Sequence, residues 1–111
     1  MGADGFLLYY GVRYIVSYQA EEEIASLEEG THPKLEAARK AGLQDWWGKT
    51  EDENYFLLIG AQLGNLGWEG DEHRRIEESD LAAIMNITRA KLQQAGFSQI
   101  PALHAQFEPD F

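Results

Sequence analysis

The sequence predicts an α+β fold with one four-stranded antiparallel sheet and helices on one face of it. Three observations predict this fold: two long apolar runs rich in aromatic and β-branched residues, two stretches with helical spacing, and the order in which they alternate along the chain. With 111 residues, 44% of them hydrophobic, the chain is expected to form one globular domain over residues 1–111.

The first apolar run, residues 6–18, alternates like a strand. Its even positions carry no charge, whereas its odd positions include Arg13 and Ser17. Successive side chains of a strand point to opposite faces, so one face is wholly apolar and the other is mixed. We therefore expect a central strand.

Helical spacing follows in AEEEIASLEEG, where apolar residues lie three apart among glutamates. The helix is expected to be broken near Gly30–Pro33, because Gly30 ends the first part and Pro33 suits the first turn of the second. Thr31 or His32 is the expected cap. Leu35 and Ala38 are the expected buried residues of the second part.

The stretch WWGKTEDENYFLLIG, residues 46–60, places a charged turn directly before an apolar block. The segment LQDWWGKT predicts a short strand, and YFLLIGAQL predicts a second central strand. The turn lacks the Asn-Gly pair of a tight hairpin, which predicts a loop of four or five residues. Trp46 and Trp47 are adjacent in a strand, so they must point to opposite faces.

A glycine-rich, acidic connection over residues 64–78 precedes the last two elements. We expect Ser79 to cap a third helical segment that ends at Gly96. The word QIPALHAQFEP then alternates apolar and polar residues, and its prolines suit a half-exposed edge strand.

The resulting order, β-α-β-β-α-β, predicts a ferredoxin-like two-layer sandwich with the antiparallel sheet order 4-1-3-2. In that order the first and third strands lie in the middle, and these are the two most apolar strands here. Two pairs of similar segments also recur in the two halves of the chain, which supports an internal repeat. They are GFLLYYG with YFLLIG, and ARKAGLQ with LQQAGFSQ.

Two helices cover only one face of such a sheet, yet the other face is not polar. If odd positions of the third strand point inward, the outer face holds Phe56 and Leu58 beside Leu7 and Tyr9. Contiguous apolar surface usually marks an interface. We expect a second copy of the chain to cover this face, or else the connection 64–78 with Trp68.

The same outer face collects four candidate ligand-binding residues on three neighbouring strands, Arg13, Gln62, His104 and Gln106, with Glu108 near one end. Such groups above an apolar floor could bind a small anionic or carbonyl ligand, and a histidine exchanges protons near neutral pH. The alternative is that they are hydrogen-bonding residues at the rim of an interface.

Other motifs indicate no cofactor and no metal. GNLGWEG lacks the lysine of a phosphate-binding loop and is followed by acids that would repel an anion. Trp68 in this loop is a candidate for partner contact. EGDEHRR has no metal-ligand spacing, and no catalytic triad can be argued from the sequence.

Nine basic residues against nineteen acids give a net charge of −10, which works against binding nucleic acid or an anionic membrane. The apolar N-terminal run contains Arg13 and has no basic region before it, so neither a signal peptide nor a membrane span is expected. The chain has no cysteine. We expect a soluble, cytoplasmic protein.

Three functions remain open on the sequence alone. The first is a non-enzymatic binding or regulatory module that self-associates as a homodimer and contacts a protein or small-molecule ligand. The second is a cofactor-independent small-molecule enzyme of the dimeric α+β barrel type, with His104 and Arg13 in its cavity. The third is an acidic inhibitor or immunity-type protein that masks a basic partner.

Overall fold

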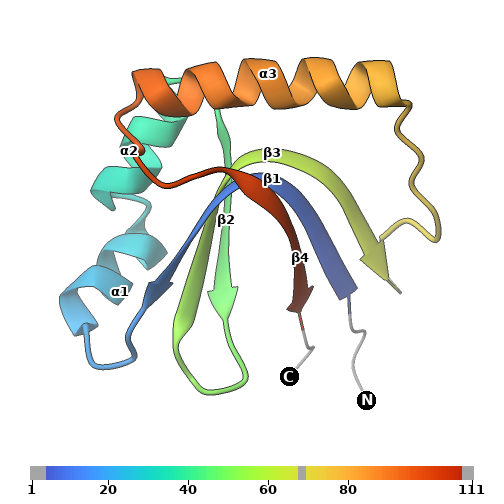
Figure 1. Ribbon diagram of the computed structural model, residues 1–111. Coiled ribbons are helices and arrows are strands. Elements are labelled where there is room, and N and C mark those ends of the chain that lie inside the picture. The colour runs from blue at the N-terminus through green and yellow to red at the C-terminus, as the bar shows by residue number, and fades with distance from the viewer. Residues whose placement is uncertain (1–4, 68–69, 109–111) are drawn as a thin grey trace.

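A computed structural model describes residues 5–67 and 70–108 of the chain (Figure 1). The fold is α+β, with four strands and three helices in these residues. No helix of this described part is both long and apolar enough to cross a membrane. The elements in chain order are β1 (Gly5–Val16), α1 (Glu21–Glu29), α2 (Pro33–Lys40), β2 (Gln44–Lys49), β3 (Tyr55–Gly67), α3 (Glu78–Gln94) and β4 (Ala102–Glu108).

The four strands form one antiparallel sheet in the order β2-β3-β1-β4. This is the predicted order read from the other edge, and it confirms that the two most apolar strands lie in the middle. β3 pairs with β1 along all of Gly5–Val16. Each edge strand covers only half of its central neighbour: β2 pairs with Tyr55–Gly60 and β4 with Gly5–Gly11.

The sheet is arched rather than flat (Figure 1). Gly11 and Gly60 pair with each other in the middle of the two central strands, and a β-bulge interrupts the register between Leu8 and Tyr9. Glycines at a bend and bulges are the usual means by which a sheet curves. All three helices lie on the convex side: α3 runs over the top, and α1 and α2 cover one leg.

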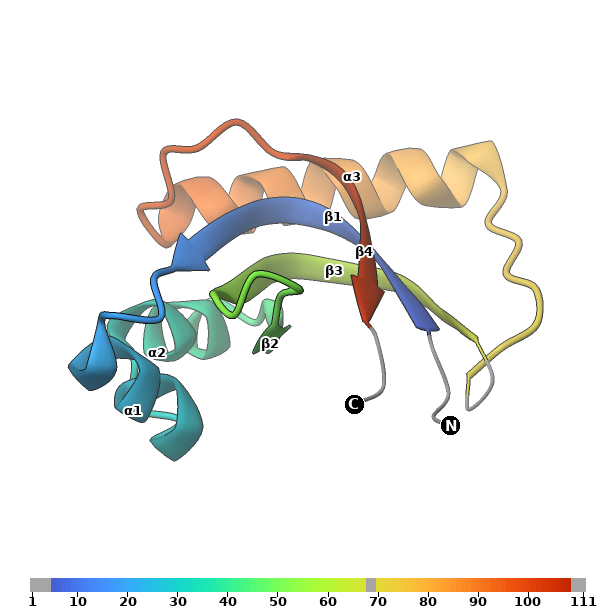
Figure 2. The ribbon, with the colours of Figure 1, turned by 90° about the horizontal axis from the view of Figure 1, so that it is seen from below.

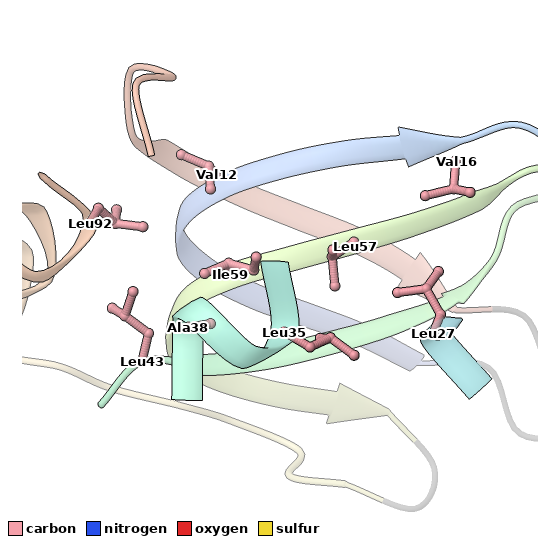
Figure 3. Packing of buried hydrophobic residues seen from close by; sticks show 9 residues of the cluster. All are labelled: Val12, Val16, Leu27, Leu35, Ala38, Leu43, Leu57, Ile59 and Leu92. Atoms are coloured by element: carbon pink, nitrogen blue, oxygen red, sulfur yellow. The ribbon is translucent and has the colours of Figure 1, made fainter. Parts of the chain in front are cut away.

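The main core lies between this convex face and the helices (Figure 3). Leu35 and Ala38 of α2 are fully buried in it, as their spacing predicted. Leu57 and Ile59 of β3 point toward them, which confirms that odd positions of this strand face the helices. The buried cluster is Val12, Val16, Leu27, Leu35, Ala38, Leu43, Leu57, Ile59 and Leu92.

The first helical segment is broken where the sequence predicted. Gly30 follows α1 with a left-handed backbone, φ 75°, and α2 begins at Pro33. His32 is the cap, because its Nδ1 accepts a hydrogen bond of 3.1 Å from the backbone N–H of Lys34. The β2–β3 turn spans five residues, 50–54, also as expected.

Two boundaries differ from the sequence prediction. Ser79 is not a cap: α3 begins at Glu78 after Glu77, so Ser79 lies inside the first turn. β3 also continues to Gly67, so the predicted connection is partly strand. Residues 64–67 pair with the start of β1, a tertiary contact that outweighs their local glycine-rich composition.

One pattern of backbone hydrogen bonds repeats at the ends of α2 and α3. Leu43 donates to Ala38 at 2.8 Å after α2, and Phe97 donates to Leu92 at 3.0 Å after α3. The glycines that precede Leu43 and Phe97 both have positive φ, 76° and 87°. Both helices thus end in the same motif before the chain enters an edge strand.

The repeat extends to the two glutamines that follow these helix ends. Gln44 accepts a 2.8 Å hydrogen bond from the backbone N–H of Gln62. Gln99 accepts a 3.0 Å hydrogen bond from the backbone N–H of Arg13. Each glutamine side chain therefore provides a hydrogen-bond acceptor for a backbone N–H of a central strand, just beyond the point where the edge strand stops pairing with it.

Candidate functional site

The concave face of the arch holds a second, separate apolar cluster. Leu7, Tyr9, Phe56 and Leu58 form it, and each is at most 1% exposed. The sequence placed these residues correctly on the face opposite the helices. These four side chains are already buried in one copy of the chain, and the cover of this face by a second copy or by the connection 64–78 with Trp68 stays a prediction.

Contact between the two edge strands helps to close this face. The indole Nε1 of Trp46 on β2 donates a 2.7 Å hydrogen bond to Oε1 of Glu108 on β4. Gly48 makes room for it, since a Cβ there would lie 2.9 Å from the Phe56 ring and 3.3 Å from the Glu108 carboxylate. Sequence analysis missed this contact because a flat sheet of order 4-1-3-2 keeps its two edges apart. In the sequence, the small Gly48 opposite the large Phe56 was the feature that could have indicated this contact.

Arg13 crosses the concave side of the arch and meets Gln106. Its Nε donates a 2.8 Å hydrogen bond to Gln106 Oε1, and its guanidinium carbon lies 5.8 Å from the centre of the Phe56 ring. The arch makes this contact possible, since Gln106 pairs with Leu7, six residues away along β1. Two of the four predicted site residues are therefore in direct contact.

Gln62 and His104 lie in another row of the same face, on either side of Tyr9. The Tyr9 hydroxyl donates a 3.3 Å hydrogen bond to Gln62 Oε1. Burial, with a smaller effect of the Asp45 carboxylate, raises the pKa of Tyr9 well above its ordinary value. His104 Nε2 lies 3.2 Å from the carbonyl oxygen of Gly11. Because a carbonyl only accepts, Nε2 carries the proton and donates it.

The four predicted site residues thus share one face but make three separate contacts: Arg13–Gln106, Gln62–Tyr9 and His104–Gly11. Each side chain hydrogen-bonds to a neighbour within the chain: Arg13, Gln62 and Gln106 through side chains, and His104 through the backbone of Gly11. These bonds tie the strands to one another across the arch. The arrangement is that of a satisfied polar network above an apolar floor.

An open hollow of about 440 Å³ lies beside this network. Arg13 and Gln106 line it together with Phe107 and residues 50–52 of the β2–β3 turn. Glu51 and Asp52 bring carboxylates to its rim, and the Thr50 hydroxyl donates to Asp52. This hydrogen bond, the largest of several influences, lowers the pKa of Asp52.

Acidic residues gather at the leg of the arch that carries this turn. Asn54 Oδ1 accepts a 3.0 Å hydrogen bond from the backbone N–H of Tyr18, which fixes the turn beside the start of α1. This bond sets the β2–β3 turn, which carries Glu51–Glu53, beside the segment that leads into Glu21–Glu23 of α1. Tyr18, between them, is 55% exposed.

Apolar side chains are exposed at the opposite leg and on α3. Leu103 of β4 is 65% exposed and Phe6 of β1 is 48% exposed, with the ring of Phe6 5.2 Å from that of Phe107. Ile87 of α3 is 56% exposed. Exposed large apolar residues on neighbouring strands are a common property of contact surfaces.

Two further sequence predictions concern Trp68 and metal binding. Trp68, the predicted partner-contact residue, lies outside the described residues. In residues 5–67 and 70–108, no group of three or more His, Asp or Glu side chains is placed to hold a metal ion. The part of EGDEHRR that is described is exposed.

Comparisons of the chain with protein-family models, with curated proteins and with solved structures found no match.

Proposed function

We propose that the protein is a non-enzymatic binding or regulatory module that acts as a homodimer through β4. The observation that carries this proposal is the outer edge of β4, which no strand in residues 5–67 and 70–108 pairs with and which contains no acid, lysine or arginine from Ala102 to Phe107. Monomeric proteins usually protect edge strands with charges, bulges or prolines. An edge without charge from Ala102 to Phe107, beside the exposed Leu103 and Phe6, supports a contact surface.

The charge distribution supports a second copy as the occupant. The chain carries a net charge of −10, so two copies repel each other wherever acids face acids. Glu21–Glu23 and Glu51–Glu53 lie on the other leg of the arch from β4 (Figure 1). Antiparallel pairing of two β4 strands places the same residues opposite one another about a twofold axis and keeps these acids apart.

The contacts of the polar concave face favour binding over catalysis. Arg13, Gln106, Gln62 and His104 all make hydrogen bonds within the chain, and the floor beneath them is filled by Phe56. A cofactor-independent enzyme needs such groups directed at a substrate. The alternative of a small-molecule enzyme is therefore less well supported than a module whose contacts are made by its outer surface.

Sedimentation velocity and light scattering over a concentration series test the homodimer. We expect a particle of twice 12.5 kDa for the unmodified chain. Leu103→Lys places a charge on the proposed contact and should shift the protein to the monomer. Ile87→Lys, at a similarly exposed site on α3, is the matched control and should leave the dimer intact. A monomer at every concentration, or equal effects of the two variants, would refute the proposal.

A second candidate function is favoured by the acids that α1 and the β2–β3 turn bring together. A clustered negative surface suits an inhibitor or immunity-type protein that masks a basic partner. Titration with a short lysine-rich peptide tests this candidate. Binding that weakens as salt is added supports it, and binding unaffected by salt argues against it.

We further propose that the fold is a ferredoxin-like split βαβ repeat in a cytoplasmic protein. The paired sets Gln44–Gln62 and Gln99–Arg13, and the matching helix ends, support two related halves. A chain without cysteine is compatible with the reducing cytoplasm. Fractionation of cells that express a tagged copy tests the location.

A further inference from the structure

Within residues 5–67 and 70–108, no strand lies along the outer edge of β1 beyond Gly11, where the pairing with β4 ends (Figure 2). The backbone N–H of Arg13 donates to the side chain of Gln99, so the peptide groups of Arg13 point away from β3. Backbone groups alternate in direction along a paired strand, so those of Ile15 point the same way. The edge from Arg13 to Val16 therefore presents backbone groups to the outside.

On the edge of β3 that β2 leaves uncovered, the described residues form one isolated bridge, between Leu66 and Asp71. Beyond Gln62, where β2 stops covering β3, Asp71 donates a 2.8 Å hydrogen bond to the carbonyl of Asn65. Gly67 in turn donates a 3.2 Å hydrogen bond to the carbonyl of Asp71. The chain's own connection thus adds to the β3 edge, while no segment of the described residues pairs with the same edge of β1.

The β1 edge carries the apolar Ile15, and charged side chains of both signs lie near it: Arg13 and Lys34 as well as Glu51 and Asp52. The Ile15 side chain is 52% exposed on this edge. Glu51 and Asp52 line the adjoining hollow of about 440 Å³. Tyr18, whose backbone N–H donates to Asn54 of the turn, leads into Glu21 and Glu22 at the start of α1. A second copy of this chain would bring the same acids to the edge, whereas a basic segment would find complementary charge.

We propose that the β1 edge from Arg13 to Val16 binds an extended, lysine- or arginine-rich segment of a partner protein as an added strand. The N–H of Ile15 donates to the segment, and the carbonyls of Arg13 and Ile15 accept from it. The acids at the rim select the basic residues that flank the paired part. This inference rests on the proposed function as a binding module, but it uses β1 rather than the β4 edge.

Amide NMR with two designed peptides tests the proposal directly. The probe is a short peptide of alternating lysine and valine, and its control alternates glutamate and valine. We expect the lysine peptide to shift the Ile15 amide resonance and slow its hydrogen exchange, with no effect of the glutamate peptide. Absence of any change at residues 13–16, or equal changes with both peptides, would overturn the proposal.

Substitutions then separate this edge from the rest of the surface. Ile15→Lys sets a positive charge against the basic segment and should weaken its binding by about tenfold or more. Ile87→Lys, at a similarly exposed residue of α3, is the matched control. Glu51→Lys, in the exposed turn, should also weaken binding and does not depend on the folding of an altered β1. Equal affinities of all three variants would overturn the proposal.

The same variants distinguish the basic segment from the homodimer. Leu103→Lys should abolish the dimer and leave the affinity for the lysine peptide unchanged. If Leu103→Lys leaves a monomer that no longer binds the peptide, the β1 edge is not an independent site and the proposal fails. If Ile15→Lys rather than Leu103→Lys abolishes the dimer, the occupant of the β1 edge is a second copy, and both proposals are wrong.

Discussion

Gly11 and Gly60 face each other across the two central strands so closely that neither position has room for a side chain. A Cβ added to Gly11 would lie 2.0 Å from the carbonyl oxygen of Ile59, and one added to Gly60 would lie 2.1 Å from that of Tyr10. These glycines pair in the middle of β1 and β3, and both strands bend in their middle part (Figure 1). The concave cluster and the contacts across the arch therefore depend on this pair.

Gly11→Ala should lower the free energy of unfolding by about 3 kcal/mol or more, because the methyl group overlaps backbone atoms that no rotamer change can move. Urea denaturation followed by circular dichroism measures this loss. Gly96→Ala is the control: its backbone φ is 87° but nothing lies within 4 Å of the added Cβ. Strain alone should cost about 1–2 kcal/mol there. Similar losses in the two variants would show that close approach does not determine the arch.

The hydrogen bond between Trp46 and Glu108 predicts coupling between the two edge strands. Trp46→Phe keeps an aromatic ring but removes the 2.7 Å donor, and it should cost about 1 kcal/mol. In a Glu108→Ala background the same change should cost less, because the acceptor is already gone. A double-mutant cycle of unfolding free energies measures the difference. Additive losses would show that the edges do not cooperate.

Much of the fold was predictable from local sequence. Alternation predicted the central strands, and Gly30, His32 and Pro33 predicted the break between α1 and α2, because these signals act within a few residues. The extension of β3 to Gly67 was not predictable, since residues 64–67 become strand only by pairing with the start of β1. The arch was missed for the same reason: the two glycines that face each other are 49 positions apart in the sequence.

The candidate site was also predictable in part: the face of each residue followed from local sequence, and the contacts between residues did not. Alternation placed Arg13, Gln62, His104 and Gln106 on the correct face. It did not predict that Arg13 reaches Gln106, because in a flat strand their rows are six residues apart. Curvature converts a spread-out row of polar residues into a bonded network. Only small residues that pair with large ones, such as Gly48 opposite Phe56, could have indicated this curvature from the sequence.

His32 should stabilise the junction of the two short helices through both of its ring nitrogens. Nδ1 accepts from Lys34, and Nε2 lies 3.0 Å from a carboxylate oxygen of Glu23 on α1. His32→Ala should cost about 1–2 kcal/mol, whereas His32→Asn keeps a capping acceptor and should cost less. Thermal denaturation of both variants checks the order. Equal losses would indicate that the cap contributes nothing.

The hydrogen bond from Thr50 to Asp52 predicts a pH-dependent contribution to stability. It lowers the pKa of Asp52 in the folded protein relative to the unfolded chain. The contribution is therefore fully present above the unfolded pKa and is lost as pH falls through the folded pKa. Thr50→Val should raise the pKa of Asp52 toward its ordinary value, and Thr50→Ser should preserve the low pKa. NMR titration of the Asp52 carboxyl carbon measures both. An unchanged pKa in Thr50→Val would mean that the backbone of the turn, not the hydroxyl, holds the carboxylate.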